Sequence, residues 1–351
     1  MQAFNLPLFL SIEENIFQNL KEKLDKQFDN IEKKKIMVFT SNGVYEKFNP
    51  EFENLQFQLD NLSIYFVEVS SYDVAVEVAK IISIEDFDII IGIGGGKVLD
   101  TAKYAAYVSK KKYISIPTIL SNDGIASPIA VLKTVKGRAK SFGCKIPDGI
   151  LIDIGIIKNT PEFLLMSGIG DTVSNYSALF DWKLECKYKN ILANDFAYLL
   201  SDTALNMLLY SRETNIRSKN FIRQLAQSLV LSGLAMDISG NSRPCSGSEH
   251  LFSHSLDEYF NIDAPHGLKV ALGCLASCIL QKRDYSIILE FLQRYNINVS
   301  PSQLGISKET FIDAWLKAQS TRPDRFSILN TINLTKGNLE EIYNELMEAI
   351  N

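Results

Sequence analysis

The chain has 351 residues, of which 46% are hydrophobic and 22% charged, and its 36 basic and 41 acidic residues give a net charge of −5. This composition is typical of a globular protein of about two domains, and it excludes a disordered chain, a collagen-like repeat and a disulfide-bonded miniprotein. The acidic balance without a basic block argues against nucleic acid and anionic membranes as partners, and no apolar run approaches the ~20 residues of a membrane-spanning helix.

The first part of the chain alternates between strand-like and helix-like segments. Strands are predicted by compact apolar runs at 36–40, 63–69, 88–93 and 113–116, and helices by the spacing at 74–82 and 99–108. Because these runs are continuously apolar, we expect strands buried on both faces of a parallel sheet with crossover helices. Segments 129–134 and 139–144 flank Val135–Arg138 as a predicted hairpin, and 149–154 is a further apolar run.

Strand signals become rare after Thr160. Thr160 is a predicted helix N-cap, with Pro161 at the first helical position. Long helical patterns follow, including 195–210, 221–236 and 339–350. We therefore predict an α/β domain over residues 1–157 and an all-helical domain over residues 158–351.

The five cysteines are scattered, and no Cys-x-x-Cys pair occurs. Free thiols in a reducing, cytoplasmic compartment are the simplest interpretation. Cys274 and Cys278 lie four residues apart on a predicted helix, and we expect them to share a buried face as small hydrophobic residues. The N-terminus carries no basic segment before its apolar residues, so no signal peptide is expected.

A glycine-rich turn follows the predicted strand at 88–93. Gly94, Gly95 and Gly96 let the backbone approach a ligand, and the N-terminus of the next helix offers free N–H groups to a phosphate. The loop does not match the dinucleotide-binding pattern GxGxxG. It is also not a Walker A motif, because Val98 follows Lys97 at the position where a Walker A motif needs Ser or Thr. A tight structural turn is the alternative, but three successive glycines favour phosphate binding.

The chain's three histidines are His250, His254 and His266. His250 and His254 share one face of a predicted helix, and His266 lies in a predicted turn before a helix that begins near Lys269. Such imidazoles, with a carboxylate, can bind zinc and leave a coordination position open for substrate. A hydrogen-bonded cluster without metal is the alternative. The metalloprotease motif HExxH is excluded because Leu251 occupies the position of its Glu.

Asp171 is the best candidate for the carboxylate ligand. It follows the glycines at 168 and 170 and opens a predicted helix through Leu184, so N-capping that helix is an equally good interpretation. Glu249 is a weaker candidate, because on a helix it points about 100° away from His250.

The order of these motifs along the chain resembles that of a superfamily that contains glycerol dehydrogenases, iron-containing alcohol dehydrogenases and dehydroquinate synthases. The resemblance covers nearly the whole chain: the GGGK loop, Pro117–Gly124, Gly-Ile-Gly-Asp at 168–171, His-x3-His and Pro265-His266-Gly267. Three segments are most similar to the sn-glycerol-1-phosphate dehydrogenases within it: 121–128, 170–184 and 242–250.

This resemblance implies a Rossmann-like domain that binds the nicotinamide cofactor NAD(P)H, followed by an all-α domain that binds metal and substrate. It implies that Asp171, His250 and His266 bind zinc, with nickel or another divalent ion as possible substitutes. Asp171, His254 and Asp123 would be the catalytic residues, the last two by contacting the substrate. The implied cofactor contacts are Gly94, Gly95, Gly96, Lys97, Val98, Thr118, Ile119, Leu120, Ser121 and Ser127.

The implied reaction is reversible hydride transfer between NAD(P)H and dihydroxyacetone phosphate, giving sn-glycerol 1-phosphate, in a homo-oligomer. The alternatives are a dehydrogenase of an unphosphorylated polyol such as glycerol and a dehydroquinate synthase-like cyclase. Asn175 stands where iron-dependent relatives carry a His ligand, and Ser174 stands at the Lys position of the cyclases' Glu-x2-Lys pattern. Both departures favour a three-ligand, zinc-type dehydrogenase site.

Two further expectations concern the ligands. Ser41 aligns with the position where a carboxylate holds the adenosine ribose and repels a 2′-phosphate, so we expect both NADH and NADPH to be used. Arg243, Ser246 and Lys269 are the candidate phosphate contacts, although solvated or structural roles are equally compatible with the sequence.

Overall fold

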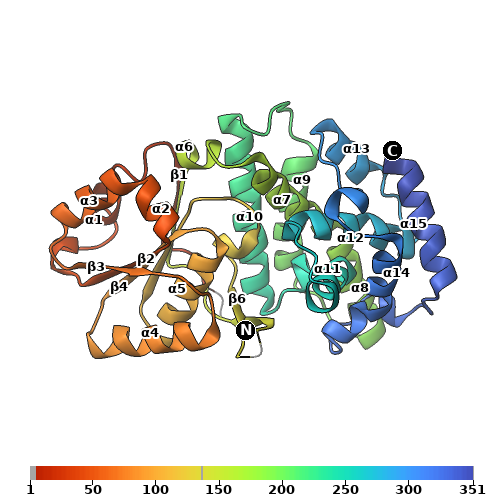
Figure 1. Ribbon diagram of the computed structural model, residues 1–351, viewed down its shortest axis with the longest axis horizontal. Coiled ribbons are helices and arrows are strands. Elements are labelled where there is room, and N and C mark those ends of the chain that lie inside the picture. Colours follow the sequence, from red (N-terminus) through yellow and green to blue (C-terminus); the bar gives the residue numbers. More distant parts are fainter. Residues whose placement is uncertain (1–4, 136, 351) are drawn as a thin grey trace. The chain divides into compact units, whose positions relative to one another are not determined.

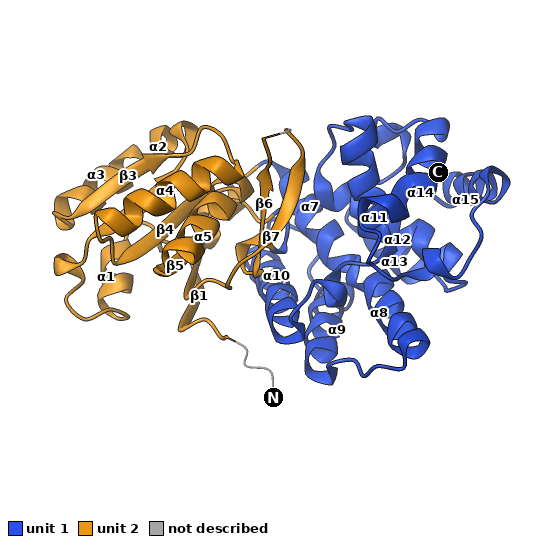
Figure 2. Ribbon diagram, turned by 90° about the horizontal axis from the view of Figure 1, so that it is seen from below, with its two compact units in different colours: residues 1–3, 121–123, 161–351 blue, residues 4–120, 124–160 orange. Residues whose placement is uncertain are grey.

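The computed structural model describes residues 5–135 and 137–350 and divides into two compact units (Figure 2). The first, which we call the α/β unit, extends up to Leu120 and includes Gly124–Thr160. The second, the helical unit, consists of Ser121–Asp123 and the chain from Pro161 onward. Each unit is described by itself.

The α/β unit contains a six-stranded parallel sheet with the order β1-β8-β5-β4-β2-β3. Its strands are β1 (Phe9–Glu13), β2 (Ile36–Thr40), β3 (Leu62–Phe66), β4 (Ile89–Gly94), β5 (Lys112–Pro117) and β8 (Gly149–Asp153). The predicted parallel sheet is confirmed. Strand β1 was not predicted, because this edge strand is only half-buried and lacks a continuous apolar run.

Helices cover both faces of the sheet (Figure 1). On one face, α4 (Tyr72–Ile84) and α5 (Gly96–Ser109) pack on β2, β4 and β5. On the other, α1 (Leu20–Asp25) and α3 (Asn49–Gln58) contribute to a second apolar cluster with the same strands. Two-sided burial explains the continuous apolar runs of the central strands.

Two short elements and a hairpin complete this unit. They are α2 (Asn42–Lys47), α6 (Ile154–Lys158), and the antiparallel pair of β6 (Ile129–Lys133) and β7 (Ala139–Gly143). The hairpin prediction is confirmed for both strands, and Lys136 of its predicted turn lies outside the described residues.

The described residues of the helical unit form helices and contain no strand. The long helices are α7 (Glu162–Val173), α8 (Asn175–Lys189), α9 (Asp195–Leu209), α10 (Lys219–Ser239), α11 (Ser248–Ser255), α12 (His266–Leu280), α13 (Ser286–Arg294), α14 (Lys308–Thr321) and α15 (Lys336–Ile350). The helices predicted at 195–210, 221–236 and 339–350 are confirmed within three residues at each end. The prediction for Thr160 is wrong, because α7 begins one residue later, after Pro161, and the Thr160 hydroxyl donates to the Ile157 carbonyl instead (2.8 Å).

All five cysteines are free, and Cys274 and Cys278 are buried together on α12, as predicted. Across residues 5–135 and 137–350, none of the helices combines the length and apolar character needed to cross a membrane.

Candidate active site

Three helices of the helical unit bring the predicted metal ligands together. Asp171 lies on α7, His250 on α11, and His266 is the first residue of α12. Two local predictions are therefore wrong: Asp171 lies inside a helix rather than at an N-cap, and α12 begins at His266 rather than near Lys269. The shared face of His250 and His254 on one helix is confirmed.

Glycines next to two of the ligands let α7 and α12 approach closely. A Cβ atom on Gly267 would overlap the carbonyl oxygen of Ser167, and one on Gly170 would overlap the carbonyl oxygen of Gly267. The glycine before Asp171 and the glycine after His266 thus face each other across a backbone contact. These glycines bring the two ligands together, which is why Gly170 occurs within a helix despite its low helix propensity.

The ligand atoms have a spacing that suits a metal ion. Asp171 Oδ1 lies 3.7 Å from His250 Nε2 and 3.6 Å from His266 Nε2, and the three ligand atoms all lie within 4.8 Å of one another. These separations are too long for strong hydrogen bonds. They are close to the ~3.4 Å expected between two ligands of one tetrahedral zinc ion at about 2.1 Å each. The donor set therefore fits a divalent metal with one open position.

Each ligand is oriented by a hydrogen bond at its other polar atom. His250 Nδ1 lies 2.9 Å from Glu249 Oε1, and His266 Nδ1 lies 3.3 Å from Ser253 Oγ. Asp171 Oδ2 accepts a hydrogen bond from the backbone N–H of Asp123 (2.9 Å). These contacts fix the side chains so that both Nε2 atoms and Oδ1 face one point, as outer partners do in metal sites.

The electrostatics of the cluster favour a cation. Burial alone would raise the pKa of Asp171, but His250 and His266 hold it below its usual value. Burial also opposes a charge on His250, yet Asp171 and Glu249 outweigh it and raise the pKa of His250 to about 9. Burial lowers the pKa of His266 to about 4. At neutral pH, His250 is thus protonated beside an ionised Asp171, and a bound metal would displace the proton of His250.

His254 lies beside this cluster but outside the group of possible ligands. Its ring centroid is 6.2 Å from that of His250 and 6.3 Å from that of His266. Burial lowers the pKa of His254 well below its usual value, and the positive charge of Arg322 is the next largest cause. The His254 imidazole is therefore neutral, with one nitrogen as donor and the other as acceptor.

The predicted cofactor residues of the α/β unit gather at the carboxyl ends of β4 and β5. Gly94 ends β4, Gly95 caps α5, and the N–H of Thr118 donates to the Gly94 carbonyl (3.0 Å). A Cβ atom on Gly95 would lie 3.0 Å from Ile119 Cδ1, whereas one on Gly96 would have no described heavy atom within 4 Å. The helix terminus at Gly96 is thus open to a ligand.

The remaining predicted cofactor residues differ in exposure. Lys97 is exposed, whereas Val98, Leu120 and Ser127 are buried, and Val98 packs over Gly94. Ser121 belongs to the helical unit, where its carbonyl accepts a hydrogen bond from Ser167 Oγ (2.9 Å).

Two of the candidate phosphate contacts are already paired with carboxylates. Lys269 Nζ donates to Asp257 Oδ1, and Arg243 Nη1 lies 2.5 Å from Glu185 Oε2.

The sequence did not predict which residues orient the candidate metal ligands, namely Ser253 and the buried Glu249. For Glu249, its adjacency to His250 was the available signal, but only the fold shows that the carboxylate turns back to Nδ1.

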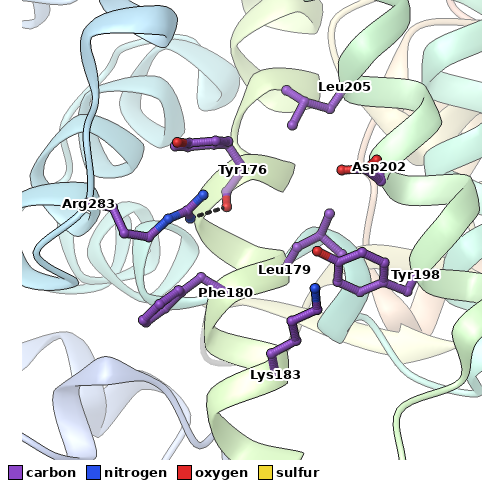
Figure 3. Close-up of a pocket in the computed structure, with 8 residues that line it drawn as sticks. All are labelled: Tyr176, Leu179, Phe180, Lys183, Tyr198, Asp202, Leu205 and Arg283. Carbon is purple, nitrogen blue, oxygen red and sulfur yellow. Dashed lines mark hydrogen bonds between the residues drawn. The ribbon is translucent and has the colours of Figure 1, made fainter.

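A separate hollow of about 170 Å³ lies in the helical unit (Figure 3). The two cationic side chains of its lining both contact aromatic rings. The Arg283 guanidinium lies 3.8 Å from the Tyr176 ring centre and donates to the Tyr176 carbonyl, and Lys183 Nζ lies 4.0 Å from the Tyr198 ring centre. The lining contains none of the predicted site residues and consists of Tyr176, Leu179, Phe180, Lys183, Tyr198, Asp202, Leu205 and Arg283.

Comparisons with known proteins agree with this architecture. A family model described as iron-containing alcohol dehydrogenase matches residues 12–161. Glycerol-1-phosphate dehydrogenase [NAD(P)+] of Methanobrevibacter smithii is 35% identical over 311 residues, which cover 87% of this chain and 86% of the relative. The enzyme of the same name from Methanothermobacter thermautotrophicus is 37% identical over 260 residues, covering 74% and 75% of the two chains.

Solved structures share the fold. A probable glycerol dehydrogenase from Sinorhizobium meliloti superposes with a TM-score of 0.75 at 20% identity, covering 99% of this chain and 98% of that chain. Sulfoacetaldehyde reductase from Bifidobacterium kashiwanohense, solved in complex with NAD+, gives a TM-score of 0.72 at 13% identity, covering 99% and 98%. At these identities the likeness establishes the fold alone.

Proposed function

The chain belongs to the glycerol-1-phosphate dehydrogenase family, within the iron-containing alcohol dehydrogenases, and from this membership we propose that it interconverts dihydroxyacetone phosphate and sn-glycerol 1-phosphate with NAD(P)H. The observation that carries the proposal is the convergence of Asp171, His250 and His266, with every ligand oriented by a second contact. We assign cofactor binding to residues 1–157, and metal and substrate binding to residues 158–351.

The chemistry divides between the bound groups and the protein. Zinc, or nickel or another divalent ion in its place, would be held by Asp171, His250 and His266 and would polarise the ketone, while NAD(P)H supplies the hydride. Asp123 orients Asp171 through its backbone N–H and is proposed to contact the substrate with its carboxylate. His254, as a neutral imidazole, can donate to a substrate oxygen and accept from water, which is the arrangement that a proton relay requires.

The glycine loop is the proposed cofactor site. The first backbone N–H groups of α5, at Gly96 and Lys97, have no acceptor among the described residues, and the space beside Gly96 is open. A pyrophosphate there would accept these N–H groups at the positive end of the helix, with the exposed Lys97 nearby. Thr118 and Ile119, packed on the same glycines, would complete the site, and we also propose contacts from Gly94, Gly95, Val98, Leu120, Ser121 and Ser127.

The direct test follows the absorbance of the reduced nicotinamide with zinc-loaded protein. We expect rapid oxidation with dihydroxyacetone phosphate, little with dihydroxyacetone, and sn-glycerol 1-phosphate as the product in an enantiomer-specific assay. Equal or faster reaction with the unphosphorylated ketone would instead assign a polyol dehydrogenase. No oxidation with either ketone would point to a cyclase.

Ser41 is the proposed determinant of cofactor choice. It follows β2 and caps α2, with its hydroxyl accepting from the Val44 N–H (3.4 Å), and it carries no charge that would repel a 2′-phosphate. We expect NADH and NADPH to be used at similar rates. The Ser41→Asp variant should keep the cap, because Asp and Ser are similar N-cap residues, and lose about 10- to 100-fold in kcat/KM for NADPH alone.

The neutral Ser41→Asn variant, which also preserves the cap, is the control for this comparison. It should keep dual cofactor use. If the Asp and Asn variants behave alike, or if the unmodified protein strongly prefers NADH, Ser41 does not set the cofactor preference.

We further propose a cytoplasmic homo-oligomer, a dimer or larger. Five large apolar side chains between the end of α8 and the first turns of α9 are exposed, namely Tyr188, Ile191, Leu192, Phe196 and Leu199. Exposed apolar residues grouped in this way are typical of association surfaces. Light scattering that gives the mass of a single 39.4 kDa chain would exclude this state.

A further inference from the structure

Helix α5, which begins at the glycine loop, carries a lysine that is almost completely buried. The side chain of Lys103 is 1% exposed. Its ammonium group has three N–H donors, and the structure gives it three acceptors. Lys103 Nζ lies 2.7 Å from the Gly124 carbonyl oxygen, 2.8 Å from the Ile129 carbonyl oxygen and 3.4 Å from Asp100 Oδ1. All the donors of this buried cation are therefore used within the α/β unit.

Asp100, almost one turn before Lys103 on the same helix, contacts the same stretch of backbone. Its Oδ2 accepts a hydrogen bond from the Val131 N–H (3.1 Å), while its Oδ1 faces Lys103. Burial raises the pKa of Asp100, and the charge of Lys103 opposes this rise. The pair thus holds segment 124–131 at three backbone groups, namely the carbonyls of Gly124 and Ile129 and the N–H of Val131.

The segment held in this way adjoins two of the proposed site residues. The chain returns from the helical unit to the α/β unit at Gly124, and Asp123 is the last residue before this return. The backbone N–H of Asp123 donates to Asp171 Oδ2 (2.9 Å). Ser127 is buried and lies in the chain between the two carbonyl groups that Lys103 contacts.

Stability alone does not account for a buried ion pair at this place. The cost of removing a lysine and an aspartate from water can exceed the gain from their attraction, and well-packed apolar residues are often at least as stabilising. An apolar side chain, however, offers no donor to a buried carbonyl group. The property that distinguishes Lys103 from an apolar residue is therefore that it donates to two backbone carbonyls and fixes where they lie.

We propose that Lys103 is a positioning residue, which fixes segment 124–129 beside the helix that begins at the cofactor loop. Ser127 is thereby placed for the cofactor. Because a peptide bond joins Asp123 to Gly124, the same contacts limit where Asp123 can lie. This inference rests on the proposed function. Lys103 acts in it through Ser127 and Asp123 and contacts neither the substrate nor the cofactor itself.

The test removes the ion pair without leaving an isolated charge. In the Asp100→Asn/Lys103→Met double variant, the Asn keeps an acceptor for the Val131 N–H, but both carbonyls lose their lysine donor. We expect the Kd for NADH to rise about 10-fold, which is the scale of one lost hydrogen bond. The kcat with dihydroxyacetone phosphate should fall about 100-fold, because a misplacement of about 1 Å can have this effect. Fluorescence titration with NADH and steady-state rates measure the two effects.

Hydrogen exchange of the zinc-loaded proteins shows whether the change is local. The backbone amides of segment 124–131 should exchange about 10-fold faster or more in the double variant, whereas those of β4 should keep their rates. A role in stability alone would accelerate exchange across the whole α/β unit and lower the melting temperature, with the NADH affinity of the folded protein unchanged. That outcome would overturn the proposal.

Lys35→Met is the matched control. Lys35 Nζ also contacts a backbone carbonyl and a carboxylate, both of Glu85 (2.9 and 3.1 Å), but its side chain is 39% exposed. Lys35 precedes the amino end of β2, whereas the glycine loop follows the carboxyl end of the parallel β4. The Kd for NADH, the kcat and the exchange of segment 124–131 should stay within about twofold of the unmodified protein, as for other surface changes.

The binding and exchange measurements separate this proposal from the proposed function. If the unmodified protein oxidises NADH with neither ketone, the proposed function fails. The NADH titration and the exchange of segment 124–131 need no turnover, so they still decide whether Lys103 positions this segment for the cofactor. Unchanged exchange in the segment would overturn the proposal even if kcat fell.

Discussion

The Asp171→Asn variant is expected to lose its bound divalent metal and at least a thousandfold in kcat/KM for dihydroxyacetone phosphate. A thousandfold loss corresponds to about 4 kcal/mol of transition-state stabilisation, which is the scale of Lewis-acid activation of a carbonyl. Asp171 is the only anionic member of the ligand group that the described residues form. The amide keeps the size of the side chain, so the change removes the charge without creating a cavity. Metal content after dialysis and steady-state rates measure the two effects together.

His254→Gln is the control for this experiment. It lies on the same helix face as His250 but outside the ligand group, so the variant should retain a full equivalent of metal and lose activity through substrate contacts alone. Loss of metal from His254→Gln would identify it as a ligand. Full metal content in Asp171→Asn would show that the carboxylate is not one. Removal of the metal by a chelator should abolish turnover, and zinc should restore it.

The α/β unit could be predicted from the sequence because burial leaves a simple pattern there. Strands β2 and β4 lie between helices on both faces, so nearly every residue is apolar, and their limits were predicted within one residue. Strand β1 pairs only with β8 at the sheet edge, and its half-buried pattern resembles that of a loop. Pattern reasoning therefore works best where burial is symmetrical.

The candidate metal site was harder to predict from local sequence. The glycines at 168 and 170 indicated a loop before Asp171, but they lie within α7, and Gly170 is needed for its contact with α12. The sequence alone does not distinguish a glycine in a turn from a glycine within a helix that allows a second helix to pack closely against it. Local spacing also left open which two histidines bind metal, because only the fold shows which Nδ1 atoms are held by Glu249 and Ser253.

The candidate phosphate contacts show another limit of local reasoning. Arg243 and Lys269 were chosen because they are close to the histidines along the chain, yet each is paired with a carboxylate. Such pairing becomes visible only in the coordinates, because the carboxylates lie elsewhere in the sequence.

Gly267→Ala is expected to lower both the stability of the protein and its affinity for metal. The new methyl group would overlap the Ser167 carbonyl on α7, and backbone atoms cannot move aside as the end of a flexible side chain can. Helices α7 and α12 must therefore separate, at a cost of about 3 kcal/mol or more, as for other overpacked buried sites. Because Asp171 and His266 sit on these two helices, their ligand atoms would separate as well. Thermal unfolding with and without zinc, together with metal content, measures both effects.

Gly43→Ala is the matched control, since a Cβ atom there would meet no described heavy atom within 4 Å and the residue lies in helix α2. That variant should be neutral or more stable by up to about 1 kcal/mol, because alanine is the better helix former. A Gly267→Ala protein that melts like the unmodified chain would show that α7 and α12 do not touch at this point. A variant that is destabilised yet binds zinc with full affinity would show that the close helix contact maintains the fold without positioning the ligands. Loss of both would link the two glycines to the metal centre through a single backbone contact.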